Sequence, residues 1–323
     1  MIEPIPNSPA GTPKRNTPPD RPVLNSPHGA DAIAHLPMER INPPQPFFRG
    51  FFRAVREVWV YRELLGSLIR KELKVKYKDS FLGFLWSLAR PMLMLAIYRV
   101  AIGKFLGVSI PNFVIYLFIG LIAWGLFTDI LGACTGSIVG NAGLIKKVYF
   151  PRELLPLASV GAAFVHFCIQ IFVLMAAMLL LRFDFFGWNL LLVFPSLLVL
   201  LLLAIGSGFI LSGANVYLRD VQHLLEMVLL FLFWMTPVVY PVTFVTHRLR
   251  PSLTQLYLLN PLTNVVIGFQ RAFYKHVSVK GTEVLYPGNI LARLGVLIVV
   301  GAIFMWLGQR IFSKAQGNFA QEL

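Results

Sequence analysis

Long apolar segments constrain the fold of this chain more than any other feature of its sequence. Residues 190–214 read LLLVFPSLLVLLLLAIGSGFILSGA and contain no charged side chain. A helix needs about 20 mostly apolar residues to cross the hydrocarbon core of a bilayer. The sequence therefore predicts an all-α integral membrane protein, with a transmembrane domain over residues 81–314. Its six predicted transmembrane helices cover roughly residues 81–103, 113–139, 155–181, 190–214, 223–240 and 289–312.

Composition and charge placement agree with a membrane protein. Of the 323 residues, 56% are hydrophobic and 14% are charged, whereas soluble domains have about 45–50% apolar and about 25% charged residues. The net charge is +14, but 19 of the 29 lysines and arginines fall on one side of the predicted bundle when the N-terminus is placed in the cytoplasm. Cytoplasmic loops carry such an excess. We therefore expect both termini, including residues 315–323, in the cytoplasm, and no nucleic-acid partner.

Two regions precede the first predicted span. Residues 1–46 hold twelve of the 22 prolines and are predicted to be a disordered cytoplasmic tail, because they lack the apolar residues of a core. Residues 47–80 form a predicted interface region. Within it, the apolar residues Tyr61, Leu64, Leu65, Leu68, Ile69 and Leu73 recur at helical spacing. This pattern predicts an amphipathic helix that lies at the cytoplasmic interface of the membrane. The helix either only anchors the bundle or also contacts a cytoplasmic partner.

The stretch from about residue 241 to residue 288 is too long and too apolar for a plain loop. In NPLTNVVIGFQRAFY, Asn260 suits a helix cap and Pro261 the first helical position. We predict one or two short re-entrant helices in the outer leaflet or over the outer mouth of a pathway, with Gln270 and Arg271 off the apolar face. Asn260, Pro261, Phe269 and Arg271 are the candidate residues of an outer gate, and simple structural packing is the alternative.

A basic interruption, NAGLIKKVYFPRE at residues 141–153, separates the second and third predicted spans. The charge placement puts it on the cytoplasmic side, beside the amphipathic helix. Its apolar residues within a basic frame suit either a passive turn between two helices or a surface on which a partner docks.

Catalytic chemistry is absent from the sequence. It contains no GxxxxGK[ST] phosphate loop, no HExxH and no GxSxG motif, and Cys134 and Cys168 lie apart in apolar segments. We therefore expect no cofactor, no metal and no enzymatic activity in this chain.

Charged residues within the predicted spans include Arg90, Asp129 and Glu226. Ionisable groups in a bilayer are a functional hypothesis by default, because inserting each is unfavourable by about 2.5–3.5 kcal/mol. Arg90 and Asp129 lie at similar depths, so they are predicted to pair within or between subunits, whether for function or only for packing.

Aromatic residues in the second and fifth spans are candidates for lining a path. Sugar rings stack their CH faces on aromatic rings, which allows a polysaccharide to be guided without tight binding. The candidates are Tyr116, Trp124, Phe127, Phe231, Trp234 and Tyr240. Ordinary packing is the alternative for all six.

Four blocks, in order, resemble the ABC-2 type permeases that export bacterial polysaccharides such as O-antigen, capsule, teichoic acid and galactan. The first is YRELLGSLIRKELKVKYKDSFLGFLWSLARPMLML at residues 61–95. The others are NAGLIKKVYFPRELLPLASV at 141–160, LSGANVYLRDVQHLLEMVLLFLFWMTPVVYP at 211–241 and LNPLTNVVIGFQ at 259–270. The resemblance covers about residues 57–312 and leaves the proline-rich tail outside.

The resemblance implies one subunit of an exporter in the bacterial inner membrane. Two copies would form the channel, two separate ATPase subunits would bind ATP and Mg²⁺ below it, and the substrate would be a glycan on a polyprenyl diphosphate. In this family the regions matching residues 61–76 and 141–153 meet the ATPase. The residues carried over to that role are Arg70, Lys71, Lys74, Asn141, Leu144, Ile145, Lys146, Lys147, Tyr149, Phe150, Arg152 and Glu153.

Other functions remain open at the level of sequence. One is an ABC-2 exporter of lipids or drugs, and another is a membrane-embedded enzyme acting on prenyl-linked sugars. The lack of paired carboxylates argues against the enzyme, and the ordered family blocks argue against a passive scaffold.

Overall fold

The computed structural model describes residues 49–77, 85–98, 100–101, 112–183, 186–248, 250–274 and 288–323, and these all belong to one compact unit, residues 45–323. The predicted proline-rich tail lies outside the described residues. The residues within these ranges form helices joined by turns, without strands. The predicted all-α class is therefore confirmed.

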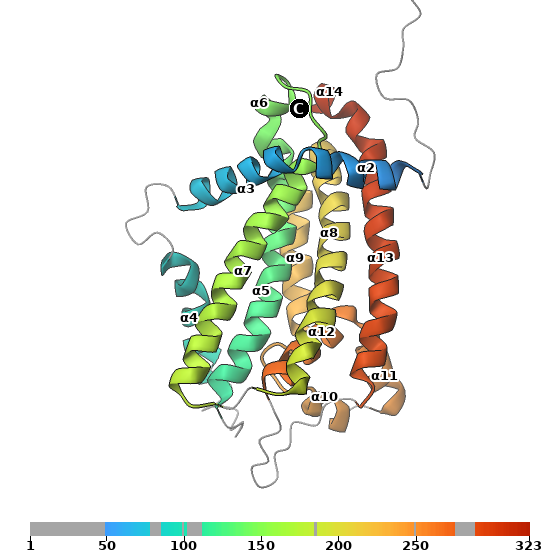
Figure 1. The fold of residues 1–323 in the computed structure, drawn as a ribbon. Coiled ribbons are helices and arrows are strands. Elements are labelled where there is room, and N and C mark those ends of the chain that lie inside the picture. Colours follow the sequence, from blue (N-terminus) through green and yellow to red (C-terminus); the bar gives the residue numbers. More distant parts are fainter. Residues whose placement is uncertain are drawn as a thin grey trace, which may run out of the picture. The chain divides into compact units, whose positions relative to one another are not determined.

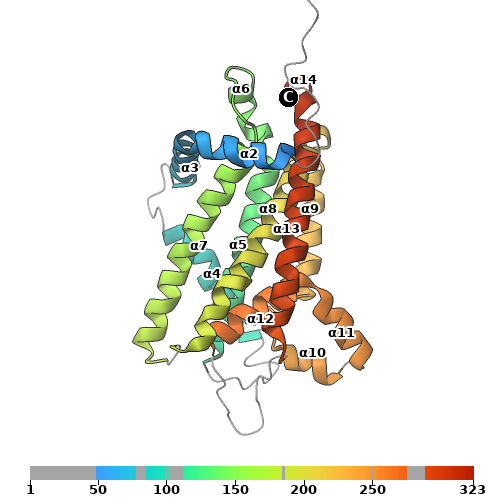
Figure 2. The same ribbon diagram turned by 45° about the vertical axis from the view of Figure 1, so that its right-hand side comes forward.

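Four helical segments are long and apolar enough to cross a membrane. They are α5 (Phe113–Ser137), α7 (Leu154–Leu180), the continuous η3 (Trp188–Leu192) and α8 (Val193–Tyr217), and α13 (Ile290–Ala315). They run side by side along the bundle (Figures 1 and 2). Their positions match four of the six predicted spans.

The fifth predicted span is shorter in the structure, and only part of the first lies within the described residues. α4 (Leu85–Tyr98) and α9 (Val221–Trp234) are described over 14 residues each. At a rise of about 1.5 Å per residue, α9 extends about 21 Å, less than the roughly 30 Å of a bilayer core. α9 ends before a turn at residues 235–240, and α4 is bordered by residues outside the described ranges.

α5 lies at the centre of the bundle and contacts α4, α7, α8, α9 and α12. It is apolar on nearly every side, which is typical of a helix buried in a core. Glycines allow α8 and α13 to touch. A Cβ on Gly308 would lie 2.3 Å from the carbonyl oxygen of Gly206, so the two backbones are in direct contact.

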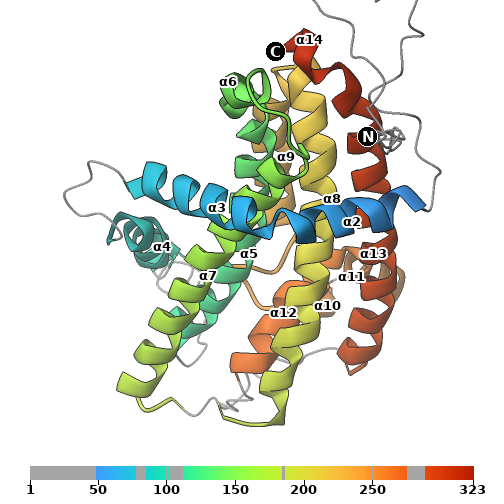
Figure 3. The same cartoon turned by 45° about the horizontal axis from the view of Figure 1, so that its top comes forward.

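Two helices cross one end of the bundle, α2 (Arg49–Val60) and α3 (Arg62–Tyr77) (Figures 1 and 3). α3 is the predicted amphipathic helix. Its Leu68 is buried and Arg70, Lys71 and Lys74 are exposed. A Cβ on Gly161 of α7 would lie 2.5 Å from Ile69 Cδ1, so α3 packs directly on α7.

Three short helices occupy the opposite end: α10 (Val242–Arg248), α11 (Pro251–Leu259) and α12 (Pro261–Phe273). The predicted cap is confirmed, since the Leu262 N–H donates to Asn260 Oδ1 at 3.0 Å and Pro261 is the first helical residue.

The predicted number of short helices was wrong, because the described part of this stretch contains three rather than one or two. α12 is buried among α5, α8 and η3. Its predicted place in the outer leaflet or over the outer mouth of a pathway stays a prediction. Gln270 is fully buried and donates from Nε2 to the Pro237 carbonyl at 2.9 Å, while its Oε1 has no hydrogen-bond partner among the described residues.

Candidate functional site

The basic loop, residues 141–153, projects from the end of the bundle that α2 and α3 cross (Figures 1 and 3). It leaves α5 through η2 (Val139–Asn141), makes one short helix, α6 (Ala142–Ile145), and enters α7 after Glu153. η4 (Gln316–Asn318) and α14 (Phe319–Glu322), which follow α13, lie at the same end.

The side chains of the basic loop divide into two sets. Ile145 and Phe150 point inward and join Leu68 and Leu154 in a second apolar core. The outward set comprises Lys146, Lys147, Val148 and Tyr149, of which Tyr149 is 85% exposed. Leu144 is half-buried. The loop therefore presents two cations and an aromatic ring on a base that the core holds in place.

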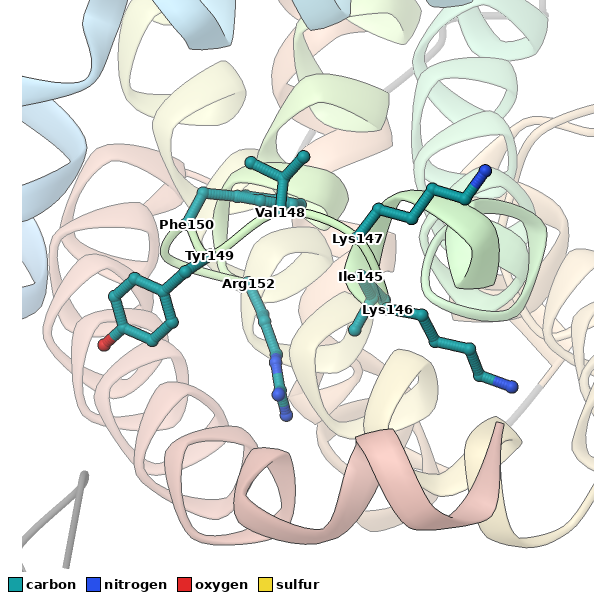
Figure 4. A pocket seen from close by; sticks show the side chains of 7 residues that line it. All are labelled: Ile145, Lys146, Lys147, Val148, Tyr149, Phe150 and Arg152. Carbon is teal, nitrogen blue, oxygen red and sulfur yellow. The ribbon is translucent and has the colours of Figure 1, made fainter. Parts of the chain in front are cut away.

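A hollow of about 220 Å³ is lined by residues 145–150 and by Arg152. Figure 4 shows Lys146, Lys147 and Arg152 extending from it in different directions, with Tyr149 on the opposite side. The two exposed lysines beside this hollow favour an acidic group in whatever binds here.

α3 is tied to the basic loop by a long-range hydrogen bond. Lys71 Nζ donates to Asn141 Oδ1 at 2.5 Å, and Asn141 Nδ2 donates to the Ser137 carbonyl at 2.8 Å. Lys71 and Asn141, both predicted to contact a partner, thus bind each other. Arg70 and Lys74 are exposed, without a partner among the described residues.

Arg152 and Glu153 also face the protein rather than solvent. Arg152 Nη1 donates to the Gln316 carbonyl, and its guanidinium lies over the Phe319 ring at 5.9 Å. Gln316 Nε2 donates to Glu153 Oε1 at 3.3 Å. Glu153 is buried, and this burial raises the pKa of its carboxyl, with the Glu57 charge adding a smaller rise. Sequence reasoning missed Gln316 and Phe319, because nothing local marks them as neighbours of residue 152.

Asp129 pairs with a residue that the sequence analysis did not consider. His166 Nδ1 lies 3.1 Å from Asp129 Oδ2, joining α5 to α7. His166 is buried, and its Nε2 has no hydrogen-bond partner within the described ranges. A histidine inside an apolar span was the available signal. The side chain of Arg90 lies outside the described residues, so the predicted Arg90–Asp129 pair stays a prediction. Glu226 is exposed on α9.

The aromatic candidates divide by helix. Tyr116, Trp124 and Phe127 of α5 are buried inside the chain, where Trp124 packs edge-on against Phe233. Phe231 and Trp234 of α9 are exposed, at 65% and 55%. In this conformation the exposed α9 rings can therefore line a translocation path along the surface of the chain, whereas the buried α5 rings cannot.

The outer-gate candidates lie in and before α12. Asn260 Nδ2 lies 3.4 Å from both the Met235 carbonyl and Thr236 Oγ1, so it holds the turn after α9. Phe269 is fully buried and packs edge-on against Phe167 of α7. Arg271 is half-buried in the last turn of α12. Tyr240, the last aromatic candidate, donates from its hydroxyl to the Trp234 carbonyl at 2.7 Å.

Comparison with known proteins identifies this arrangement. Residues 63–274, roughly two thirds of the chain, match the family model of the ABC-2 type transporter. The chain belongs to this family. The predicted resemblance is thereby confirmed for an ABC-2 permease. The matched residues include all of α3 but its first residue, and the whole of the basic loop and of α12.

Relatives of this ABC-2 permease have assigned roles. It is 31% identical over 271 residues to the O-antigen export system permease protein RfbA of Myxococcus xanthus, covering 84% of this chain and 99% of that protein. It is 28% identical over 271 residues to the protein of the same name in Klebsiella pneumoniae, covering 81% and 95%. The polysialic acid transport protein KpsM of Escherichia coli is 25% identical over 215 residues, covering 64% and 80%.

Proposed function

We propose that this chain is the membrane subunit of an ATP-driven exporter that moves a lipid-linked polysaccharide out of the cytoplasm. The observation that carries the proposal is the match to the O-antigen export permease of Myxococcus xanthus over 99% of that protein's length. The polysialic acid relative supports the same substrate class, a long glycan.

The energy source in this proposal is a separate ABC ATPase, which holds ATP and Mg²⁺. The sequence has no phosphate loop of its own. The basic loop supplies a docking surface, because Lys146, Lys147 and Tyr149 are exposed on a base anchored in the core. An acidic side chain of the ATPase fits the cationic hollow, and Tyr149 supplies an aromatic anchor of the kind that dominates interfaces.

Two copies of the chain and two ATPase subunits complete the proposed exporter in the bacterial inner membrane. α9 is exposed on most of its surface, including Leu230, Phe231 and Trp234, so it needs a partner surface or lipid. α4 and α9 count as the first and fifth of six spans, with both termini cytoplasmic. The rings of α9 then face the path and stack weakly on sugars, which suits a sliding polymer.

The lipid diphosphate enters in this scheme from the cytoplasmic leaflet. Arg70 and Lys74 on α3 are exposed and attract its negative charge. Lys71 is less available, because it binds Asn141.

Reconstitution tests the proposal. The chain and its cognate ABC ATPase are placed in vesicles with a polyprenyl-diphosphate-linked glycan, and glycan reaching the opposite face is measured with and without ATP. We expect ATP-dependent transfer of the glycan and none of a lipid carrying no sugar. Transfer of the bare lipid alone would replace this proposal with a lipid exporter, and glycan cleavage without any ATPase would indicate an enzyme.

A further inference from the structure

The basic loop is anchored at both of its ends. At its beginning, Asn141 binds Lys71 of α3. At its end, Arg152 and Glu153 bind Gln316, and Arg152 lies over Phe319. A force on the exposed tip is therefore passed to two elements, α3 and the 316–319 segment.

The 316–319 segment is firmly joined to the bundle. Phe319 is fully buried and packs edge-on against Phe312 of α13 at 5.5 Å between ring centroids. Phe312 in turn contacts Phe209 of α8 at 5.4 Å. Tyr217 donates from its hydroxyl to the Ala315 carbonyl at 2.9 Å, where α13 ends. These contacts make the segment a continuation of α13 rather than a loose tail.

α13 extends from this segment to the helices at the other end of the bundle. Its 26 residues span about 39 Å at a rise of about 1.5 Å per residue. At the far end, Leu294 is fully buried near Gly268 of α12. Arg293 Nη2 donates to Gln255 Oε1 of α11 at 3.0 Å. One rigid helix therefore connects the neighbourhood of the basic loop with α11 and α12 (Figure 2).

We propose that α13 and the 316–319 segment carry movement of the basic loop to α11 and α12, so that Gln316 and Phe319 are positioning residues for export. This inference rests on the proposed function, because it takes an ATPase to be the partner that moves the loop. The two contacts between the basic loop and the 316–319 segment have separate roles. The Arg152–Phe319 stack transmits a push, and the Glu153–Gln316 hydrogen bond keeps Arg152 in register with the segment.

Two variants test the inference against a matched control. Gln316→Ala removes the donor to Glu153 while keeping the backbone carbonyl that accepts from Arg152. Phe319→Leu keeps apolar volume in the core while removing the ring face. Gln321→Ala is the control, because Gln321 is exposed on α14, two residues after the 316–319 segment.

The reconstituted pair is assayed for ATPase affinity, for ATP hydrolysis and for glycan exported per ATP hydrolysed. We expect wild-type affinity and hydrolysis in both variants, with export per ATP reduced about 2- to 30-fold, the range of coupling effects in packed networks. Gln321→Ala should export as wild type. Gln316→Ala removes only one partly buried hydrogen bond, so it keeps the test valid if Phe319→Leu fails to fold.

A second measurement separates coupling from simple support of the loop. Hydrogen exchange of α11 and α12 should change when ATP is added to the wild-type complex, and this change should be lost in Gln316→Ala. Unchanged export per ATP in both variants would overturn the inference, as would an affinity loss that accounts for the whole export defect. Absence of ATP-dependent export by the wild-type pair would instead contradict the proposed function itself.

Discussion

The exposed lysines of the basic loop give the sharpest quantitative prediction. Lys146→Glu combined with Lys147→Glu should weaken binding of the cognate ATPase without unfolding the permease. Both side chains are exposed and neither forms an ion pair among the described residues, so the change in folding free energy should stay within about 0.5 kcal/mol.

The size of the effect follows from the geometry. An exposed ion pair contributes about 0.2–1 kcal/mol. Each reversal both removes an attraction and adds a repulsion of similar size, so two reversals amount to about 1–4 kcal/mol of binding free energy. The dissociation constant should therefore rise roughly 5- to 700-fold. In about 1 M salt most of the difference should vanish, because the Debye length falls to about 3 Å.

The assay is equilibrium binding of the purified ATPase to the permease in lipid nanodiscs, at low and high salt. Lys314→Glu is the control, because Lys314 is an exposed lysine in the last turn of α13, near the same end of the bundle. A double reversal with wild-type affinity and an unchanged melting temperature would refute the docking role, and the loop would then be only a turn between two helices.

Three further predictions concern stability. Burial raises the pKa of Glu153, so the folded protein loses stability as pH rises from the ordinary glutamate range through the raised pKa and the buried carboxyl ionises. Glu153→Gln should therefore melt at a higher temperature than wild type at pH 8, and this difference should shrink toward pH 5. An equal difference at both pH values would contradict the assignment. A double-mutant cycle of Asp129→Asn and His166→Gln should give a coupling energy of about 0.6 kcal/mol and at most about 1.7 kcal/mol. Additive losses would mean that the 3.1 Å contact between His166 Nδ1 and Asp129 Oδ2 does not contribute to stability. Gly161→Ala should lower stability by about 1 kcal/mol, because the added Cβ would meet the end of the Ile69 side chain and this clash outweighs the helix preference for alanine. Ile69→Val removes the Cδ1 that the new Cβ would meet, so the two changes together should lower stability by less than the sum of the two single losses. A higher melting temperature for Gly161→Ala would show that α3 does not press on α7 there.

Hydrophobic length by itself determined the membrane class and four of the spans, because a bilayer imposes one requirement on every crossing helix. The helix over residues 61–76, the Asn260 cap and the exposure of Lys146 and Lys147 were also readable locally, since each depends on neighbours within one or two turns. The assignment to the ABC-2 permeases came from the four sequence blocks that resemble this family, because hydrophobic periodicity predicts helices but does not distinguish one family from another.

Tertiary structure alone decided which residues meet. The sequence predicts a short re-entrant helix here with Gln270 off its apolar face, whereas packing of α12 against α5 and α8 buries Gln270, whose Nε2 donates to the Pro237 carbonyl. The aromatic rings of α5 point into the chain's own core, and only packing against α9 and α12 shows it. Contacts such as Arg152 with Gln316 join residues 164 positions apart, and a sequence carries no local record of a neighbour that distant.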